Sequence, residues 1–98
     1  MTGEELAGLI RSLVGVPLRT RTGLRFHVLD ADERAVLYEI SGVPRGGRLD
    51  SYVRAVEYRQ GGGSLADPLD LQALDRSNRM AVYEWAVLKQ LGLLDSSE

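Results

Sequence analysis

The chain has 98 residues, of which 44% are hydrophobic and 27% charged, and its formal net charge is −2. This composition fits one globular domain with a modest core. Because cysteine is absent, disulfides and thiolate metal sites are excluded. The chain shows no basic leader before an apolar run and no apolar stretch near the roughly 20 residues that span a bilayer, so we expect a cytoplasmic protein without a membrane anchor.

The charges are unevenly distributed along the chain. Residues 19–59 hold eight arginines and six acids, whereas residues 60–98 hold three basic residues and six acids. Eleven of the twelve basic residues are arginine. Two interpretations stay open: a compositional bias, or use of the planar guanidinium group on phosphate or carboxylate.

The first predicted element is a helix over residues 2–14. Thr2 and Glu5 have the spacing of a capping box, in which each side chain bonds to the other residue's backbone N–H. Apolar residues recur on one face, and Gly15 and Pro17 end the helix.

Alternating apolar and polar residues predict strands over residues 24–30 and 34–41. The short polar turn between them indicates a hairpin. Residues 18–21 form a weaker candidate for a third strand. Residues 42–47 contain three glycines and a proline, and we expect a loop there.

Helical periodicity returns at residues 48–59 and ends at the glycines 61–63. Residues 69–74 fit a short helical turn. Ser77 is the expected N-cap of a final helix, and Gly92 its C-terminal stop. The sequence thus predicts one α+β domain over residues 1–98, with two or three antiparallel strands, three helices covering one face of the sheet, and a polar tail at 95–98.

The final helix is apolar in almost every direction. Between residues 80 and 91 only Glu84, Lys89 and Gln90 are polar, and they point three different ways. Such a helix needs cover on most sides, which a small domain can seldom supply. We therefore expect a second copy of the chain or a larger protein assembly to contact this region. The expected interface residues are Tyr83, Trp85, Leu88 and Leu93.

A basic surface is the second candidate. The segment from Ser41 to Arg48 combines glycines and arginines before a helix, an arrangement that favours phosphate binding, although a plain flexible connection fits as well. On the helix that follows, an ordinary solvated face is the alternative, since Asp50 precedes Arg54 by four residues. The predicted nucleic-acid-binding residues are Arg19, Arg21, Arg45, Arg48, Arg54 and Tyr58.

Catalytic and metal chemistry find little support in the sequence. His27 is the only histidine, and no residue at a recognisable spacing would position it as a general base or complete a zinc site. The acids after Asp30 lack the closing glutamate of a calcium loop, because Ser41 stands at that position. We expect a protein that is not an enzyme and needs no cofactor or metal.

Three short motifs carry a resemblance to a known class of proteins. They are Thr22-Gly23-Leu24-Arg25-Phe26-x-Val28, then Ser41-Gly42-x-x-Arg45, and then Ser77-Asn78-Arg79-x-x-Val82-Tyr83-x-Trp85-Ala86-x-Leu88. Over residues 16–91 the chain resembles small accessory domains of bacterial restriction and phage-defence proteins. The resemblance implies a non-catalytic module that engages DNA or a larger assembly, although no nuclease or helicase segment accompanies it in this chain. Two functions follow: nucleic-acid binding, or self-association and protein interaction through the final helix.

Overall fold

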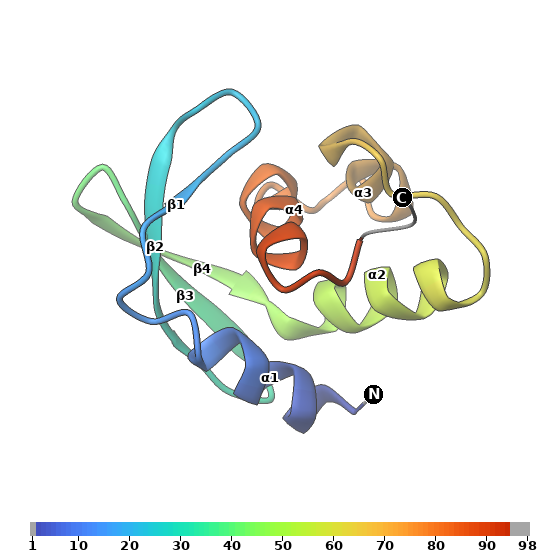
Figure 1. Ribbon diagram of the computed structural model, residues 1–98, viewed down its shortest axis with the longest axis horizontal. Helices are drawn as coiled ribbons and strands as arrows, with labels where there is room; N and C mark the ends of the chain where they lie inside the picture. The colour runs from blue at the N-terminus through green and yellow to red at the C-terminus, as the bar shows by residue number, and fades with distance from the viewer. Residues whose placement is uncertain (1, 95–98) are drawn as a thin grey trace.

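An antiparallel sheet forms one layer of the molecule and helices form the other (Figure 1). The computed structural model describes residues 2–94, so the expected polar tail at 95–98 lies outside the described residues. The α+β class is confirmed, with four strands and four helices in the described part instead of two or three strands and three helices. In chain order these are α1 (Gly3–Arg11), β1 (Leu18–Arg19), β2 (Arg25–Ala31), β3 (Ala35–Ile40), β4 (Val43–Arg48), α2 (Leu49–Gln60), α3 (Pro68–Leu74) and α4 (Ala81–Gln90).

The sheet follows the chain, because each strand pairs with the next in the order β1-β2-β3-β4. The predicted hairpin is β2 and β3, with Val28 opposite Tyr38. The weaker third strand is also present, as β1, with Leu18 opposite Phe26. Residues that face the helices are buried and their neighbours are exposed, which is the alternation that the sequence shows.

The loop predicted at residues 42–47 is wrong, since this segment forms strand β4 along the whole of β3. Ser41 and Gly42 both have positive φ, 54° and 79°. Two successive residues of that kind make the tight turn that joins twisted antiparallel strands. Glycine and proline are tolerated in β4 because it lies at the edge of the sheet.

The helix boundaries follow local capping chemistry. The capping box of Thr2 and Glu5 is confirmed at the start of α1, and Asp67 caps α3 in the same way. The expected N-cap at Ser77 is wrong: α4 begins after Met80, and Ser77 instead donates its backbone N–H to the carboxylate of Asp75 in the preceding turn.

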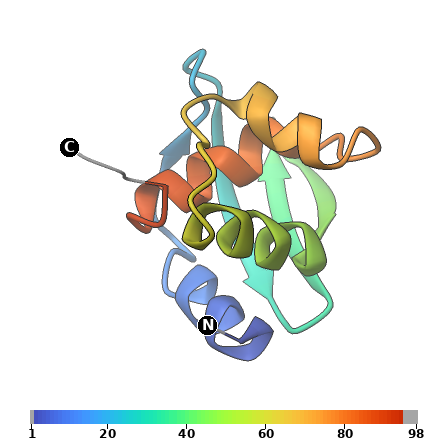
Figure 2. The ribbon, with the colours of Figure 1, turned by 90° about the vertical axis from the view of Figure 1, so that its right-hand side faces the viewer.

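The chain itself covers its apolar final helix. Figure 2 shows α4 between the sheet behind it and α2 and α3 in front. Val87 and Leu88 have no exposed surface, and Trp85 is 7% exposed. The chain therefore supplies most of this cover itself, because α4 lies between the sheet and two other helices, although Val82 of α4 is 42% exposed. Within residues 2–94 no helix has both the length and the hydropathy to cross a membrane.

Candidate functional site

The hairpin between β1 and β2 holds Arg19 and Arg21 at one edge of the sheet. Gly23 has a φ of 95° and donates its N–H to the carbonyl of Thr20 at 2.9 Å. The hydroxyl of Thr20 accepts the N–H of Leu24 at 3.1 Å, and Thr20 itself is buried. These bonds fix the turn, so the two arginines flank an anchored residue.

Arg19 lies directly opposite Arg25 on the neighbouring strand. Both residues are exposed, and neither forms an ion pair with any acid among residues 2–94. Like charges placed directly opposite each other destabilise a sheet. The pair therefore does not serve stability, and a bound anion would relieve the repulsion.

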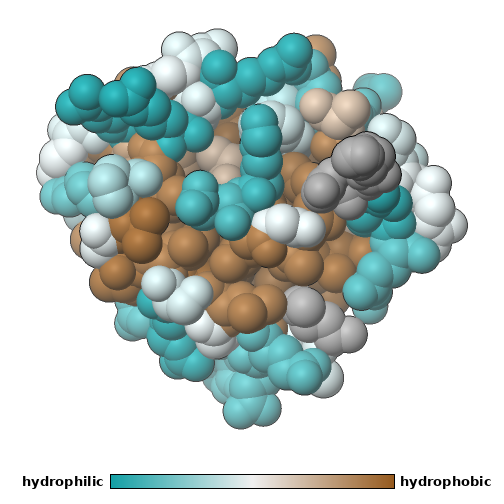
Figure 3. All heavy atoms as spheres, viewed as in Figure 1, coloured by the Kyte–Doolittle hydropathy of each residue, from teal (hydrophilic) through white to brown (hydrophobic). Residues whose placement is uncertain are grey.

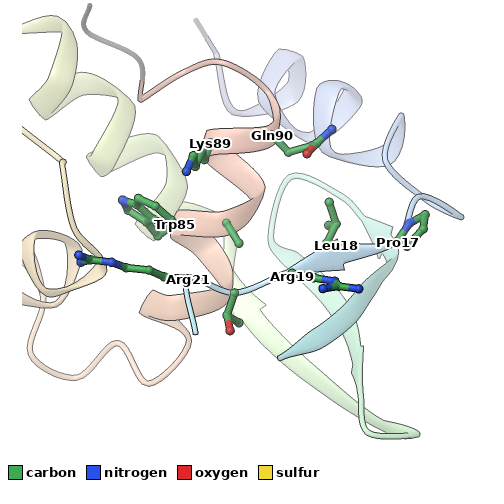
Figure 4. Close-up of a pocket in the computed structure, with 9 residues that line it drawn as sticks. Pro17, Leu18, Arg19, Arg21, Trp85, Lys89 and Gln90 are labelled. Atoms are coloured by element: carbon green, nitrogen blue, oxygen red, sulfur yellow. The ribbon is translucent and has the colours of Figure 1, made fainter. Parts of the chain in front are cut away.

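A groove separates this hairpin from α4. It has a volume of about 560 Å³ and is lined by Pro17, Leu18, Arg19, Thr20, Arg21, Trp85, Ala86, Lys89 and Gln90. Figure 4 shows Arg21 and Lys89 beside Trp85, with Arg19 farther along β1. Cations thus come from both walls of the groove, from the strand and from the helix.

A second hollow of about 540 Å³ adjoins this groove and shares Arg21, Trp85 and Lys89 with it. Leu65 and Leu94 add apolar lining there. The indole of Trp85 is held in place because its Nε1–H donates to the carbonyl of Leu65 at 3.1 Å. The Nζ of Lys89 lies over the indole ring, 5.0 Å from the ring centroid, and makes a cation–π contact with it.

One acid lies close to these cations. The carboxylate of Asp67 forms an ion pair with Arg21, whose side chain nevertheless remains 56% exposed. The same carboxylate accepts the N–H of Leu69 and caps α3. The Asp67 contact thus joins the hairpin to the helical layer.

The other predicted nucleic-acid contacts do not join this surface. Arg45 and Arg48 lie on β4, at the opposite edge of the sheet from β1. Three strand spacings separate the two edges, about 14 Å. Arg48 is paired with Asp50 at 2.7 Å and Arg54 with Asp75 at 3.6 Å.

Tyr58 does not contribute to the groove beside β1 either. Its ring packs against the backbone of Gly63, just after the end of α2. The six predicted residues thus divide into a groove-side pair, Arg19 and Arg21, of which Arg21 is paired with Asp67, and a second group on β4 and α2, of which Arg48 and Arg54 are paired with acids. Arg25, which lies opposite Arg19, and Lys89, which lines the groove, were not among the predicted residues. Lys89 was missed because only the packing of α4 beside β1 brings it there.

The four residues predicted for a partner interface mostly face the interior. Leu88 is fully buried and Trp85 nearly so. Tyr83 is half-buried and its ring packs edge-on against Phe26 at 5.1 Å. Leu93 is half-buried after the end of α4. Figure 3 shows apolar surface gathered in the middle of one face of the molecule, with hydrophilic residues around it.

A buried carboxyl group lies in the first turn of α4, and no function was predicted for it from the sequence. Glu84 is 1% exposed, and its Oε2 accepts the side-chain N–H of Asn78 at 2.9 Å. Its Oε1 has no hydrogen-bond partner among residues 2–94. Burial raises the pKa of Glu84 to about 7, while the Asn78 bond acts in the opposite direction.

Two buried tyrosines accompany this carboxyl group. The hydroxyls of Tyr38 and Tyr52 share one hydrogen bond. Burial raises the pKa of both, and the nearby charge of Glu84 raises them further. A glutamate in a helix that is apolar all round was the one available signal, since such a residue has few ways to reach solvent.

His27 lies on the open face of the sheet, where its Nδ1 is 3.7 Å from Glu39. Among the described residues no group of histidine, aspartate and glutamate side chains is arranged to hold a metal ion. Comparison with protein-family models, curated proteins and solved structures gives no match to this chain.

Proposed function

We propose that this domain binds nucleic acid through a basic edge made of Arg19, Arg21, Arg25 and Lys89. The observation that carries the proposal is the cross-strand pair of Arg19 and Arg25, which no acid among residues 2–94 neutralises. Exposed arginines that repel each other are suited to a polyanion, because phosphate groups neutralise both at once.

The position of the groove supports the same proposal. Arg19, Arg21 and Lys89 line it, so one member of the arginine pair also belongs to the wall of the groove, while Arg25 lies outside it on β2. The net charge of −2 gives the chain no general attraction for nucleic acid. Binding must then depend on this local surface, which makes the proposal specific to a few residues.

Fluorescence anisotropy tests the proposal directly. Labelled oligonucleotides, single-stranded and duplex, are titrated with the protein from low to moderate salt. We expect the logarithm of the association constant to fall linearly with the logarithm of salt concentration, because each phosphate contact releases counterions. The double variant Arg19→Gln/Arg25→Gln should make this line less steep, by roughly 0.7–0.9 in slope for each phosphate that the variant no longer neutralises.

Two further variants locate the surface. Arg34→Gln/Arg76→Gln removes the same amount of charge from exposed residues outside the groove, and should change binding far less. Arg45→Gln/Arg48→Gln removes it from the β4 edge. If the β4 variant loses as much affinity as Arg19→Gln/Arg25→Gln, the assignment to the β1 edge is wrong. If the wild-type protein binds neither oligonucleotide at low salt, nucleic-acid binding itself is refuted.

A further inference from the structure

We infer that the nucleic acid bound at the basic edge is single-stranded, with its backbone along the groove and one base in the hollow beside Trp85. This inference rests on the proposed function, because it uses the same cations. It adds the form of the ligand and a second contact surface, the hollow lined by Leu65, Ala66, Trp85 and Leu94.

The shape of the site favours a single strand over a duplex. Duplex DNA is read by a helix or ribbon that projects into one of its grooves. Here Arg19, Arg21 and Lys89 line a recess between β1 and α4 (Figure 4). A flexible strand enters such a recess, as single strands do in positively charged grooves.

The chemistry of the second hollow is suited to a base. It joins apolar side chains to the cations Arg21 and Lys89, which is the combination that a base and its adjacent phosphates require. Its volume of about 540 Å³ falls within the range of about 300–1,000 Å³ typical of small-ligand pockets. A duplex keeps its bases stacked and paired, so it leaves this hollow empty.

The order of the two hollows gives the ligand a path. Because they share Arg21, Trp85 and Lys89, a strand that passes Arg19 in the first reaches the second without leaving the protein surface. Arg21 and Lys89 then flank the point where a base turns inward. The fixed indole of Trp85, held by Leu65, forms a rigid wall at that point.

The test compares an oligothymidylate of about ten nucleotides with two other anions: the same backbone with abasic sites, which has the same charge, and a duplex of equal length, which has about twice the charge. We expect the oligothymidylate to bind roughly tenfold more tightly than the abasic strand, which corresponds to about one base contact. It should also bind more tightly than the duplex. Equal affinity for the duplex or for the abasic strand overturns this inference and leaves nucleic-acid binding intact.

A filling variant tests the hollow itself. Ala66→Leu adds apolar volume to the lining of the second hollow without changing the charge. It should weaken oligothymidylate binding roughly tenfold and leave the abasic strand unaffected. Ala73→Leu, at an exposed alanine of α3 outside both hollows, is the matched control and should change neither.

Two outcomes separate failure of the inference from failure of the proposed function. If Ala66→Leu binds as well as wild type while its melting curve shows an intact fold, no base enters the hollow and the inference fails alone. If an acidic peptide of equal charge competes as well as the oligothymidylate, or no nucleic acid binds, both the inference and the proposed function fail.

Discussion

Replacing Glu84 with glutamine should make the protein more stable at neutral pH. In the folded chain the carboxyl group is buried and one of its oxygens has no partner in the described part of the structure. Ionising it there costs free energy, because a charge in the interior loses its hydration. Glutamine keeps the shape and an acceptor for Asn78, and it carries no charge at any pH.

The size of the effect follows from the raised pKa. Folding raises the pKa of Glu84 from 4.5 to about 7. The folded state therefore holds the proton more tightly than the unfolded state, so stability falls as pH rises between these two values. At about 1.4 kcal/mol per pH unit, the loss is about 3 kcal/mol by pH 8. Among its neighbours Asp75 acts in the same direction as burial and Arg54 opposes it.

Urea unfolding of both proteins from pH 4 to pH 8 measures this difference. Below pH 4.5 the free energies of unfolding should differ little, and near pH 8 the Glu84→Gln variant should be the more stable by up to about 3 kcal/mol. The unpartnered amide N–H of the glutamine reduces that gain. Glu57→Gln, at an exposed position of α2, controls for net charge. A constant difference between wild type and Glu84→Gln across this range would refute the reasoning.

Two smaller changes test the packing around the sheet and the groove. A methyl group on Gly47 would lie 3.0 Å from the ring of Tyr38, whereas one on Gly46 would meet nothing within 4 Å. Gly47→Ala should therefore lower the melting temperature, because the close contact introduces about 1–3 kcal/mol of strain. If Gly46→Ala lowers it equally, the close contact with Tyr38 is not the cause. Trp85→Phe removes the donor to the Leu65 carbonyl and should lower the free energy of unfolding, measured by chemical denaturation, by about 1–3 kcal/mol. An unchanged free energy of unfolding would show that this hydrogen bond does not stabilise the fold.

Local chemistry predicted the elements well where one segment sufficed to define them. The capping box at Thr2 and the alternation in β2 and β3 are short-range patterns, and the structure confirms both. The strand β4 was missed because its glycines and proline are typical of a loop. The informative signal was the dipeptide Ser41-Gly42 between two apolar residues, since such a pair suits a two-residue hairpin turn.

The site depended on tertiary placement that no local pattern contains. Arg19 and Arg45 were both predicted from the sequence to bind the same nucleic acid, yet they lie on opposite edges of the sheet. Lys89 and Trp85 join Arg21 only because α4 passes next to β1. How much of α4 the chain itself buries was underestimated for the same reason. The helix has apolar residues on all sides because it lies between the sheet and other helices, and length and composition do not reveal that position.

The two edges of the sheet have a consequence for solubility. An open strand edge invites pairing with another molecule, and this is a common start of aggregation. Here one edge strand has two residues and follows Pro17, so it offers a very short template. The other edge contains Pro44, which has no N–H to give to a fifth strand, and charged Arg45 and Arg48. The same glycine- and proline-containing composition that makes β4 resemble a loop in the sequence thus also prevents a further strand from pairing with this edge of the sheet.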